Sequence, residues 1–275
     1  MAAPFKAYWT QVHPIFMIAA LQAGLVGSLF YSPFDLYRFA VVAIGIFSAL
    51  YYAHVKDSYV DYYVRHEDPA AQLTRKQSKL ALAGSVLVFF ACMAYLYTVS
   101  GWLIIPLMIG GLALAYAHAP YLDMNPLGAT AGYPTGLFLA TLAGFYSQAG
   151  FIGFSVLAFS FVVWIILNGV KIVDDIKDYG WDKPFGKRSA VVALGKRNAK
   201  LAGCALVAAG AVLGILLSLY GIFSTTTSAA FASLLPFAFV SMGKDSRKGL
   251  YGLYVLLAGV YVFTISEIII LFFGL

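Results

Sequence analysis

Charged side chains are scarce in this chain of 275 residues. Aspartate, glutamate, lysine and arginine make up 11% of the chain, whereas hydrophobic residues make up 61%. Soluble globular domains contain about 25% charged residues, so the composition excludes an ordinary soluble domain. Cysteine is scarce as well. Cys92 and Cys204 both lie within apolar runs, where a free cysteine behaves as a small core residue, and no disulfide follows from them.

Long apolar runs fill most of the sequence, and its mean hydropathy is +0.84. A helix needs about 20 apolar residues to cross a bilayer. We therefore predict an all-α membrane protein in which residues 1–275 form a single domain. The nine predicted transmembrane helices lie near 13–31, 36–54, 79–99, 102–119, 130–147, 150–171, 200–221, 226–242 and 250–273. The eighth run is short and contains Pro236.

The basic residues are unevenly distributed over the predicted connections. With nine spans, the N-terminus and every second connection lie on one side of the membrane. That side holds 17 of the 18 basic residues, including Lys244, and Arg38 lies on the other side. Because lysine and arginine collect in cytoplasmic loops, we predict a multi-pass protein of the cell membrane with a cytoplasmic N-terminus.

Acidic residues gather in two stretches, 54–69 and 168–194, which hold eight of the twelve. Asp175, Asp178 and Asp182 are spaced by three and four, which predicts three carboxylates on one helical face, and Asp57 and Asp61 are again four apart. Carboxylates without histidine or cysteine suit Mg²⁺ shared with substrate phosphates. The two stretches would then hold a metal-bound diphosphate between them. Charge runs at helix ends are more often solvated faces, but carboxylates near membrane depth are costly and usually functional.

These motifs resemble those of the UbiA superfamily of intramembrane prenyltransferases. That family has nine transmembrane helices, an Asn-Asp-x-x-Asp-x-x-x-Asp motif after the second and an Asp-x-x-Asp-x-x-x-Asp motif after the sixth. Asp175, Asp178 and Asp182 match the second motif in full. Three further segments are similar to family segments, namely Gly186-Lys187-Arg188-Ser189, Leu194-Gly195-Lys196, and Val12-His13-Pro14 with Gly24 and Gly27.

The first motif departs from the family pattern. When the chain is aligned on Asp61, Asp57 stands at the Asn position, Ser58 at the next Asp and Arg65 at the final Asp. Two interpretations of Arg65 are open: it meets the diphosphate directly, or it is a cytoplasmic topology charge. For the following Glu67 and Asp68 two interpretations are open, compensation for the lost carboxylates or exposure to solvent, and we expect the second.

The resemblance implies Mg²⁺-dependent transfer of an isoprenyl group from a prenyl diphosphate to a lipophilic acceptor. The acceptor would be an aromatic quinone precursor, an isoprenoid lipid or a carotenoid. Membrane lipids are the other expected partners, and nucleic acid is not one. The implied metal ligands are Asp57, Asp61, Asp175, Asp178 and Asp182, of which Asp61, Asp175 and Asp178 would be catalytic. The implied substrate-binding residues are Arg65, Lys187, Arg188, Asn168 and Tyr116.

Two other classes of function are open at this point. A possible division into two four-span halves and the Gly-rich helices would allow a transporter or channel for a cation or a phosphorylated lipid. Transporters usually bind near the middle of the membrane, whereas these motifs lie at one rim. A catalytically inactive relative with a scaffold role would explain the altered first motif.

Overall fold

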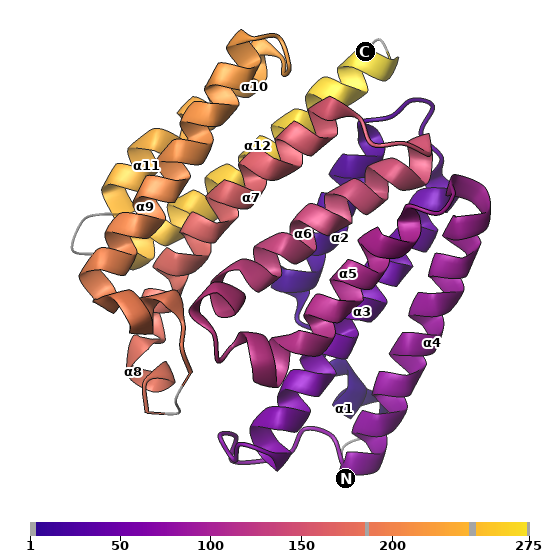
Figure 1. Cartoon of the computed structure of the whole chain (residues 1–275), viewed down its shortest axis with the longest axis vertical. Coiled ribbons are helices and arrows are strands. Elements are labelled where there is room, and N and C mark those ends of the chain that lie inside the picture. The colour runs from indigo at the N-terminus through magenta and orange to yellow at the C-terminus, as the bar shows by residue number, and fades with distance from the viewer. Residues whose placement is uncertain (1–3, 185–186, 242–245, 274–275) are drawn as a thin grey trace. The chain divides into compact units, whose positions relative to one another are not determined.

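The computed structural model describes residues 4–184, 187–241 and 246–273, and all regular structure in these ranges is helical (Figure 1). Each of the nine predicted spans coincides with a helix or a pair of helices, so the all-α prediction is confirmed. The basic residue Lys244 lies outside the described ranges.

Five of the described helical segments are by themselves long and apolar enough to cross a membrane, which supports an integral membrane protein. They are Leu36–Tyr63, Arg75–Ser100, Ile104–Leu122, Phe154–Lys177 and Ala190–Leu219. The fourth is the most deeply packed, since 72% of its apolar window is buried. It leads directly into the second acidic motif.

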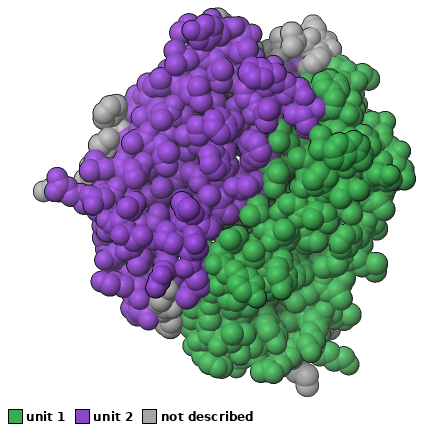
Figure 2. Space-filling model, in the orientation of Figure 1, with its two compact units in different colours: residues 1–123, 139–151 green, residues 124–138, 152–275 purple. Residues whose placement is uncertain are grey.

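The chain divides into two compact units, which Figure 2 distinguishes by colour. The first comprises residues 1–123 and 139–151, and the second comprises residues 124–138 and 152–275. One helix, α6 (Pro126–Ala149), contributes residues to both. The prediction of a single domain therefore stays a prediction.

The first unit is built on α3 (Leu36–Tyr63), which packs against α2 (Pro14–Leu29), α4 (Arg75–Ser100) and α5 (Ile104–Ala117) (Figure 1). Helix α1 (Pro4–Trp9) precedes them, and a π-helical turn, His118–Leu122, follows α5. Helix α4 begins with a capping box, because the Thr74 hydroxyl accepts from the Gln77 N–H while the Gln77 side chain accepts from the Thr74 N–H.

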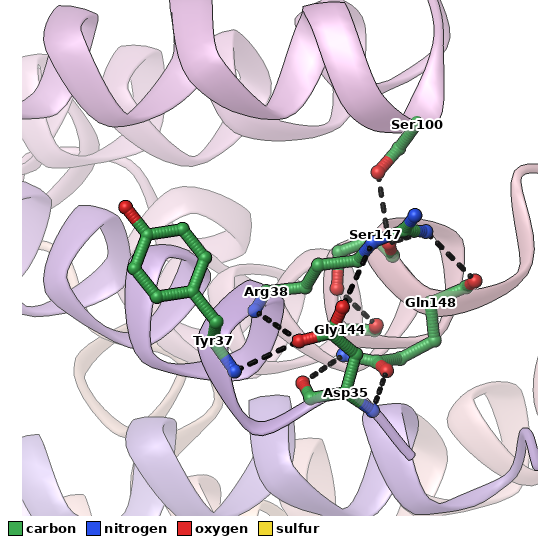
Figure 3. A network of polar contacts seen from close by, with 7 residues as sticks. All are labelled: Asp35, Tyr37, Arg38, Ser100, Gly144, Ser147 and Gln148. Atoms are coloured by element: carbon green, nitrogen blue, oxygen red, sulfur yellow. Dashed lines mark hydrogen bonds and ion pairs between the residues drawn. The ribbon is translucent and has the colours of Figure 1, made fainter. Parts of the chain in front are cut away.

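A polar network ties the start of α3 to the last turn of α6 (Figure 3). The Gln148 amide accepts from the Asp35 N–H at 2.7 Å and donates to the Asp35 carbonyl at 3.1 Å. Arg38 donates to the carbonyls of Ser147 and Gln148, and the Ser100 hydroxyl also donates to the Ser147 carbonyl. These bonds satisfy carbonyls at a helix end that have no partner within the helix.

The second unit is built on α7 (Phe154–Asp174) and α9 (Ala190–Leu219), which lie side by side (Figure 1). They approach closely at two glycines. A methyl group on Gly169 would lie 2.5 Å from the Gly203 carbonyl oxygen, and one on Gly203 would lie 2.8 Å from the Gly169 carbonyl oxygen. Small residues allow such backbone contact between membrane helices. Helix α12 (Ser246–Phe273) also packs against α7.

Several helix boundaries differ from the sequence-based spans. The predicted span 226–242 is two helices, α10 (Thr225–Ala232) and α11 (Leu234–Ser241), with a break at Ser233. Pro236 lies in the first turn of α11, where a missing N–H costs little. Helices α3 and α9 extend well beyond the apolar runs, because hydropathy marks the membrane-embedded part of a helix rather than its end. The acidic residues of the first motif therefore lie on a helix.

Candidate active site in two acidic motifs

The second motif follows α7 through a change of helix type. Helix α7 ends at Asp174, a 3₁₀ turn covers Asp175–Lys177, and the short helix α8 covers Tyr179–Asp182. The Asp178 N–H donates to the Asp175 carbonyl at 3.1 Å, and the Asp182 N–H donates to the Asp178 carbonyl at 2.8 Å. Each aspartate thus lies one turn beyond the last. The regular α-helix assumed for the predicted common face is replaced between Asp175 and Asp178 by a tighter 3₁₀ turn, in which residues three apart eclipse.

The opposite side of the motif is an apolar anchor. Ile172, Ile176 and Tyr179 pack against a small core that includes Val191 and Ala199 of α9. Apolar residues at spacings of four and three hold one face of the segment against α9. This contact fixes the position of the segment that carries the three aspartates. The Tyr179 ring is part of this contact.

Asp175 is the most buried carboxylate of the second motif, with 4% of the residue exposed. Lys171, one turn earlier on α7, donates to its Oδ1. The other oxygen, Oδ2, is buried and has no hydrogen-bond partner among the described residues. An unsatisfied buried carboxylate oxygen is costly, and a cation would remove that cost. Asp174 is instead paired with Lys177 at 2.7 Å.

The predicted phosphate-binding residues continue along the same segment. The Lys187 N–H donates to the Asp182 carbonyl at 3.1 Å, which places Lys187 beside the end of the motif. Burial raises the pKa of the Asp182 carboxyl. Arg188 is exposed. Gly186 of the similar segment lies outside the described residues. Helix α9 then begins at Ala190 and kinks at Gly195, whose φ of 75° lies in the left-handed region that favours glycine.

Asn168 is almost fully buried, with 7% exposed, and its side-chain amide donates to the Trp164 carbonyl at 2.7 Å within α7. Trp164 in turn donates to the Thr135 hydroxyl at 3.0 Å. The amide nitrogen of Asn168 is therefore engaged inside its own helix, and its predicted contact with substrate stays a prediction.

The first motif lies on the last turns of α3. Asp57 and Asp61 are both half-buried on this helix, as their spacing predicts. Helix α3 ends at Tyr63, and His66 then adopts a left-handed conformation with φ of 56°. The Glu67 N–H returns to the Asp61 carbonyl at 2.8 Å. This reversal brings residues after the helix back over its end.

Arg65 lies at the centre of the first motif. Its Nη1 pairs with Asp123 Oδ2, lies 3.5 Å from Asp61 Oδ1 and 3.9 Å from Glu67 Oε1. Its other terminal nitrogen donates to the Pro120 carbonyl at 3.3 Å. The hydrogen bond with Asp123 raises the pKa of the guanidinium. The expectation that Glu67 lies in solvent is wrong, because only 4% of its side chain is exposed.

Tyr116, predicted to bind substrate, carries another cation. The Lys56 ammonium lies 3.6 Å from the centre of the Tyr116 ring and also donates to the Tyr116 carbonyl. The residue remains 52% exposed. Lys56 therefore ties α3 to the last turn of α5, and Arg65 ties the end of α3 to the segment that follows α5.

Among the described residues, no group of three or more His, Cys, Asp or Glu side chains is arranged to hold a metal ion unaided. Mg²⁺ bound to substrate phosphates needs only one or two protein carboxylates and keeps several waters. The second motif fits that requirement, because its donors are carboxylates and Asp175 has a buried oxygen without a hydrogen-bond partner.

The whole-chain fold is that of a class of membrane proteins called UbiA homologues. One similar structure is described as concerning digeranylgeranylglyceryl phosphate synthase in membranes. The similarity covers 97% of this chain and 99% of that chain, with a TM-score of 0.76 and 17% sequence identity. A UbiA homologue from Archaeoglobus fulgidus, bound to DMAPP and Mg²⁺, is similar with a TM-score of 0.75 and 15% identity, over 95% of this chain and 98% of its own.

A third structure with this fold is an apo UbiA homologue from Aeropyrum pernix K1. It has a TM-score of 0.69 and 18% identity, over 94% of this chain and 98% of its own. Neither the protein-family models nor the curated protein sequences gave a match. The likeness therefore rests on the fold.

Three residues of the site were not predicted as members of it. Lys171 pairs with Asp175 at a spacing of four, a signal that the sequence contains. Asp123 lies 58 residues from Arg65, and nothing near it in the sequence indicates the pairing. Lys56 reaches Tyr116 over 60 residues in the same way.

Proposed function

We propose that this protein is a UbiA-type prenyltransferase, which moves an isoprenyl group from a prenyl diphosphate to a lipophilic acceptor within the membrane. The observation that supports it most directly is the second motif. Three aspartates at successive turns begin at the C-terminal end of the most deeply packed span, and the buried Oδ2 of Asp175 has no hydrogen-bond partner among the described residues. The fold is shared with structures of a UbiA homologue from Archaeoglobus fulgidus that are described as bound to GPP and Mg²⁺ and to DMAPP and Mg²⁺.

In this proposal Asp175, Asp178 and Asp182 hold Mg²⁺, which when bound neutralises charge on the diphosphate leaving group. Lys187 and Arg188 donate hydrogen bonds to phosphate oxygens. The apolar length of α7 lies behind the motif, where a hydrocarbon tail is compatible with the surrounding side chains. Exclusion of water from this region protects a developing allylic cation from hydrolysis. The proposed acceptors are an aromatic quinone precursor, an isoprenoid lipid or a carotenoid. The metal role of Asp57 and Asp61 stays a prediction from the resemblance.

A transporter is the second candidate, and the position of the motif argues against it. Asp175 lies at the C-terminal end of the span Phe154–Lys177 rather than near its middle. Transporters place their ion and substrate sites near the middle of the bilayer, commonly at interrupted helices. The orientation with a cytoplasmic N-terminus is part of the proposal, because it places both motifs on the side where the basic residues collect.

The proposal is tested by diphosphate release from purified protein in detergent. The protein is given geranylgeranyl or farnesyl diphosphate, Mg²⁺ and a panel of lipid acceptors. We expect release with formation of a prenylated product. Asp175→Asn should lower the rate by at least about 100-fold, the scale of losing a principal electrostatic contact to the transition state.

Asp174→Asn is the matched control. Asp174 is the immediate neighbour of Asp175 but pairs with Lys177, so its variant should keep most of the activity. Equal loss in both variants would point to general damage of the segment. A folded protein that binds prenyl diphosphate but never releases diphosphate would favour the scaffold interpretation, whereas flux of a cation across liposomes would favour the transporter.

A further inference from the structure

The positive charge of Arg65 lies close to three carboxylates at the first motif. One atom, Arg65 Nη1, is within ion-pair distance of Asp61, Glu67 and Asp123. These carboxylates come from the end of α3, from the reversed segment after His66, and from the residue after the π-helical turn. Carboxylates from three places in the chain thus converge on one nitrogen.

The pairing is shielded from water. The side chains of Arg65, Asp61 and Asp123 are 13%, 18% and 14% exposed, and that of Glu67 is 4% exposed. A guanidinium remains protonated at all physiological pH values, so this positive charge is permanent. Removal of one buried partner leaves an uncompensated charge, which is strongly unfavourable.

The chemistry of the group explains why a metal ion and Arg65 are alternatives. Mg²⁺ needs oxygen ligands at about 2.0–2.1 Å in octahedral geometry. As these three described carboxylates stand, they are not arranged to hold an ion by themselves, and the cation between them is the guanidinium. The motif has gained a basic side chain at the position where the resemblance places an aspartate, and Glu67 and Asp123 supply carboxylates from outside the motif.

We propose that Arg65 takes the place of a divalent cation in the first motif. Asp61 is then a partner of the guanidinium, and the metal site is confined to the second motif. This deepens the proposed function and rests on it for the metal at the second motif. It also gives Arg65 a role different from both interpretations that the sequence left open, since the guanidinium is engaged by the protein itself.

The test counts bound Mn²⁺, a paramagnetic substitute for Mg²⁺, by electron paramagnetic resonance on the purified full-length protein. Inorganic diphosphate is present, because the second motif is proposed to hold its metal together with phosphate oxygens. We expect Arg65→Gln to bind about one more Mn²⁺ per chain than the wild type, because the guanidinium no longer occupies the position between the three carboxylates. Arg65→Lys keeps the charge and should keep the wild-type number. Arg75→Gln is the matched control, since the Arg75 guanidinium lies over the Tyr63 ring.

Thermal unfolding provides a second readout that does not depend on activity. Added Mn²⁺ should raise the unfolding midpoint of Arg65→Gln more than that of the wild type, because a ligand that binds the folded state stabilises it. The same number of bound ions in folded Arg65→Gln and in the wild type would overturn the proposal.

Asp61→Asn in the wild-type background keeps the test decisive if Arg65→Gln does not fold. The proposal expects this variant to bind as many Mn²⁺ ions as the wild type, whereas Asp175→Asn should bind fewer. Loss of an ion in Asp61→Asn would overturn the inference about Arg65 and leave prenyl transfer standing. Failure of the wild type to release diphosphate would instead overturn the proposed function.

Discussion

At the scale of single residues, the first motif depends on a partner that is remote in sequence. Asp123 is the carboxylate that binds Arg65 most closely, and both side chains are largely buried. We expect Asp123→Asn to lower the free energy of unfolding by about 3 kcal/mol, because it removes one partner of a buried ion pair. Thermal or denaturant unfolding of the purified protein measures this. The half-buried Asp68 provides the control variant Asp68→Asn, which should change stability by less than about 0.5 kcal/mol.

The two motifs were predictable to different degrees for a physical reason. The spacing of Asp175, Asp178 and Asp182 is local, so the sequence predicted that they lie on successive turns, and two consecutive backbone hydrogen bonds show that they do. The surroundings of Arg65 are not local. Glu67 returns to the motif because His66 takes a left-handed conformation, which non-glycine residues adopt only in a few per cent of cases.

At the scale of elements, the second motif is positioned by the close contact of α7 and α9. We expect Gly203→Ala to destabilise the protein by about 1–3 kcal/mol, because the new methyl group would overlap the Gly169 carbonyl and the Val173 side chain. Gly84→Ala is the matched control. No atom lies within 4 Å of the added methyl group on Gly84 in α4, and alanine favours helix more than glycine does.

The outcome is read from thermal unfolding and from diphosphate release of both variants. Gly203→Ala should lower the unfolding midpoint, and Gly84→Ala should leave it unchanged or raise it. Equal midpoints for the two variants would show that the α7–α9 contact adjusts to a methyl group, and the close approach would then not be what positions the motif.

The polar network between the start of α3 and the last turn of α6 (Figure 3) gives a second prediction at this scale. Gln148 exchanges two hydrogen bonds with the backbone of Asp35. We expect Gln148→Met to cost about 2 kcal/mol of unfolding free energy, because two neutral hydrogen bonds of about 1 kcal/mol each are lost at a nearly constant volume. Gln22→Met on α2 serves as the control. A stability loss no greater than that of the control would show that the two Gln148 hydrogen bonds do not stabilise the contact between α3 and α6.

At the scale of the whole molecule, the distribution of charge predicts the orientation in the membrane. Arg197 and Tyr220 are both exposed, and they lie near opposite ends of α9. Their separation along the helix is about 34 Å, which exceeds the roughly 30 Å hydrocarbon core. In a background without Cys92 and Cys204, a cysteine at position 197 should react with an impermeant maleimide only after the cytoplasmic face is opened. A cysteine at position 220 should react in intact cells, and the reverse pattern would contradict the cytoplasmic N-terminus.

Hydropathy predicted where helices cross the membrane, but not where they begin, end or break. The predicted span 36–54 is the apolar part of a helix that continues to Tyr63 and carries the first motif. The predicted span 226–242 breaks at Ser233, three residues before Pro236, whose ring and missing N–H interrupt a continuous helix. A sliding average of hydrophobicity does not contain such effects of single residues.

The reciprocal contact of Gly169 and Gly203 also constrains how this sequence can change over evolutionary time. In an ordinary core, enlargement of one side chain can be offset by reduction of its neighbour. Here each residue faces the main chain of the other, and no amino acid is smaller than glycine. Neither position can therefore compensate for drift at the other. Homologues that keep this pair of helices should retain both glycines, even where the apolar residues around them have been exchanged.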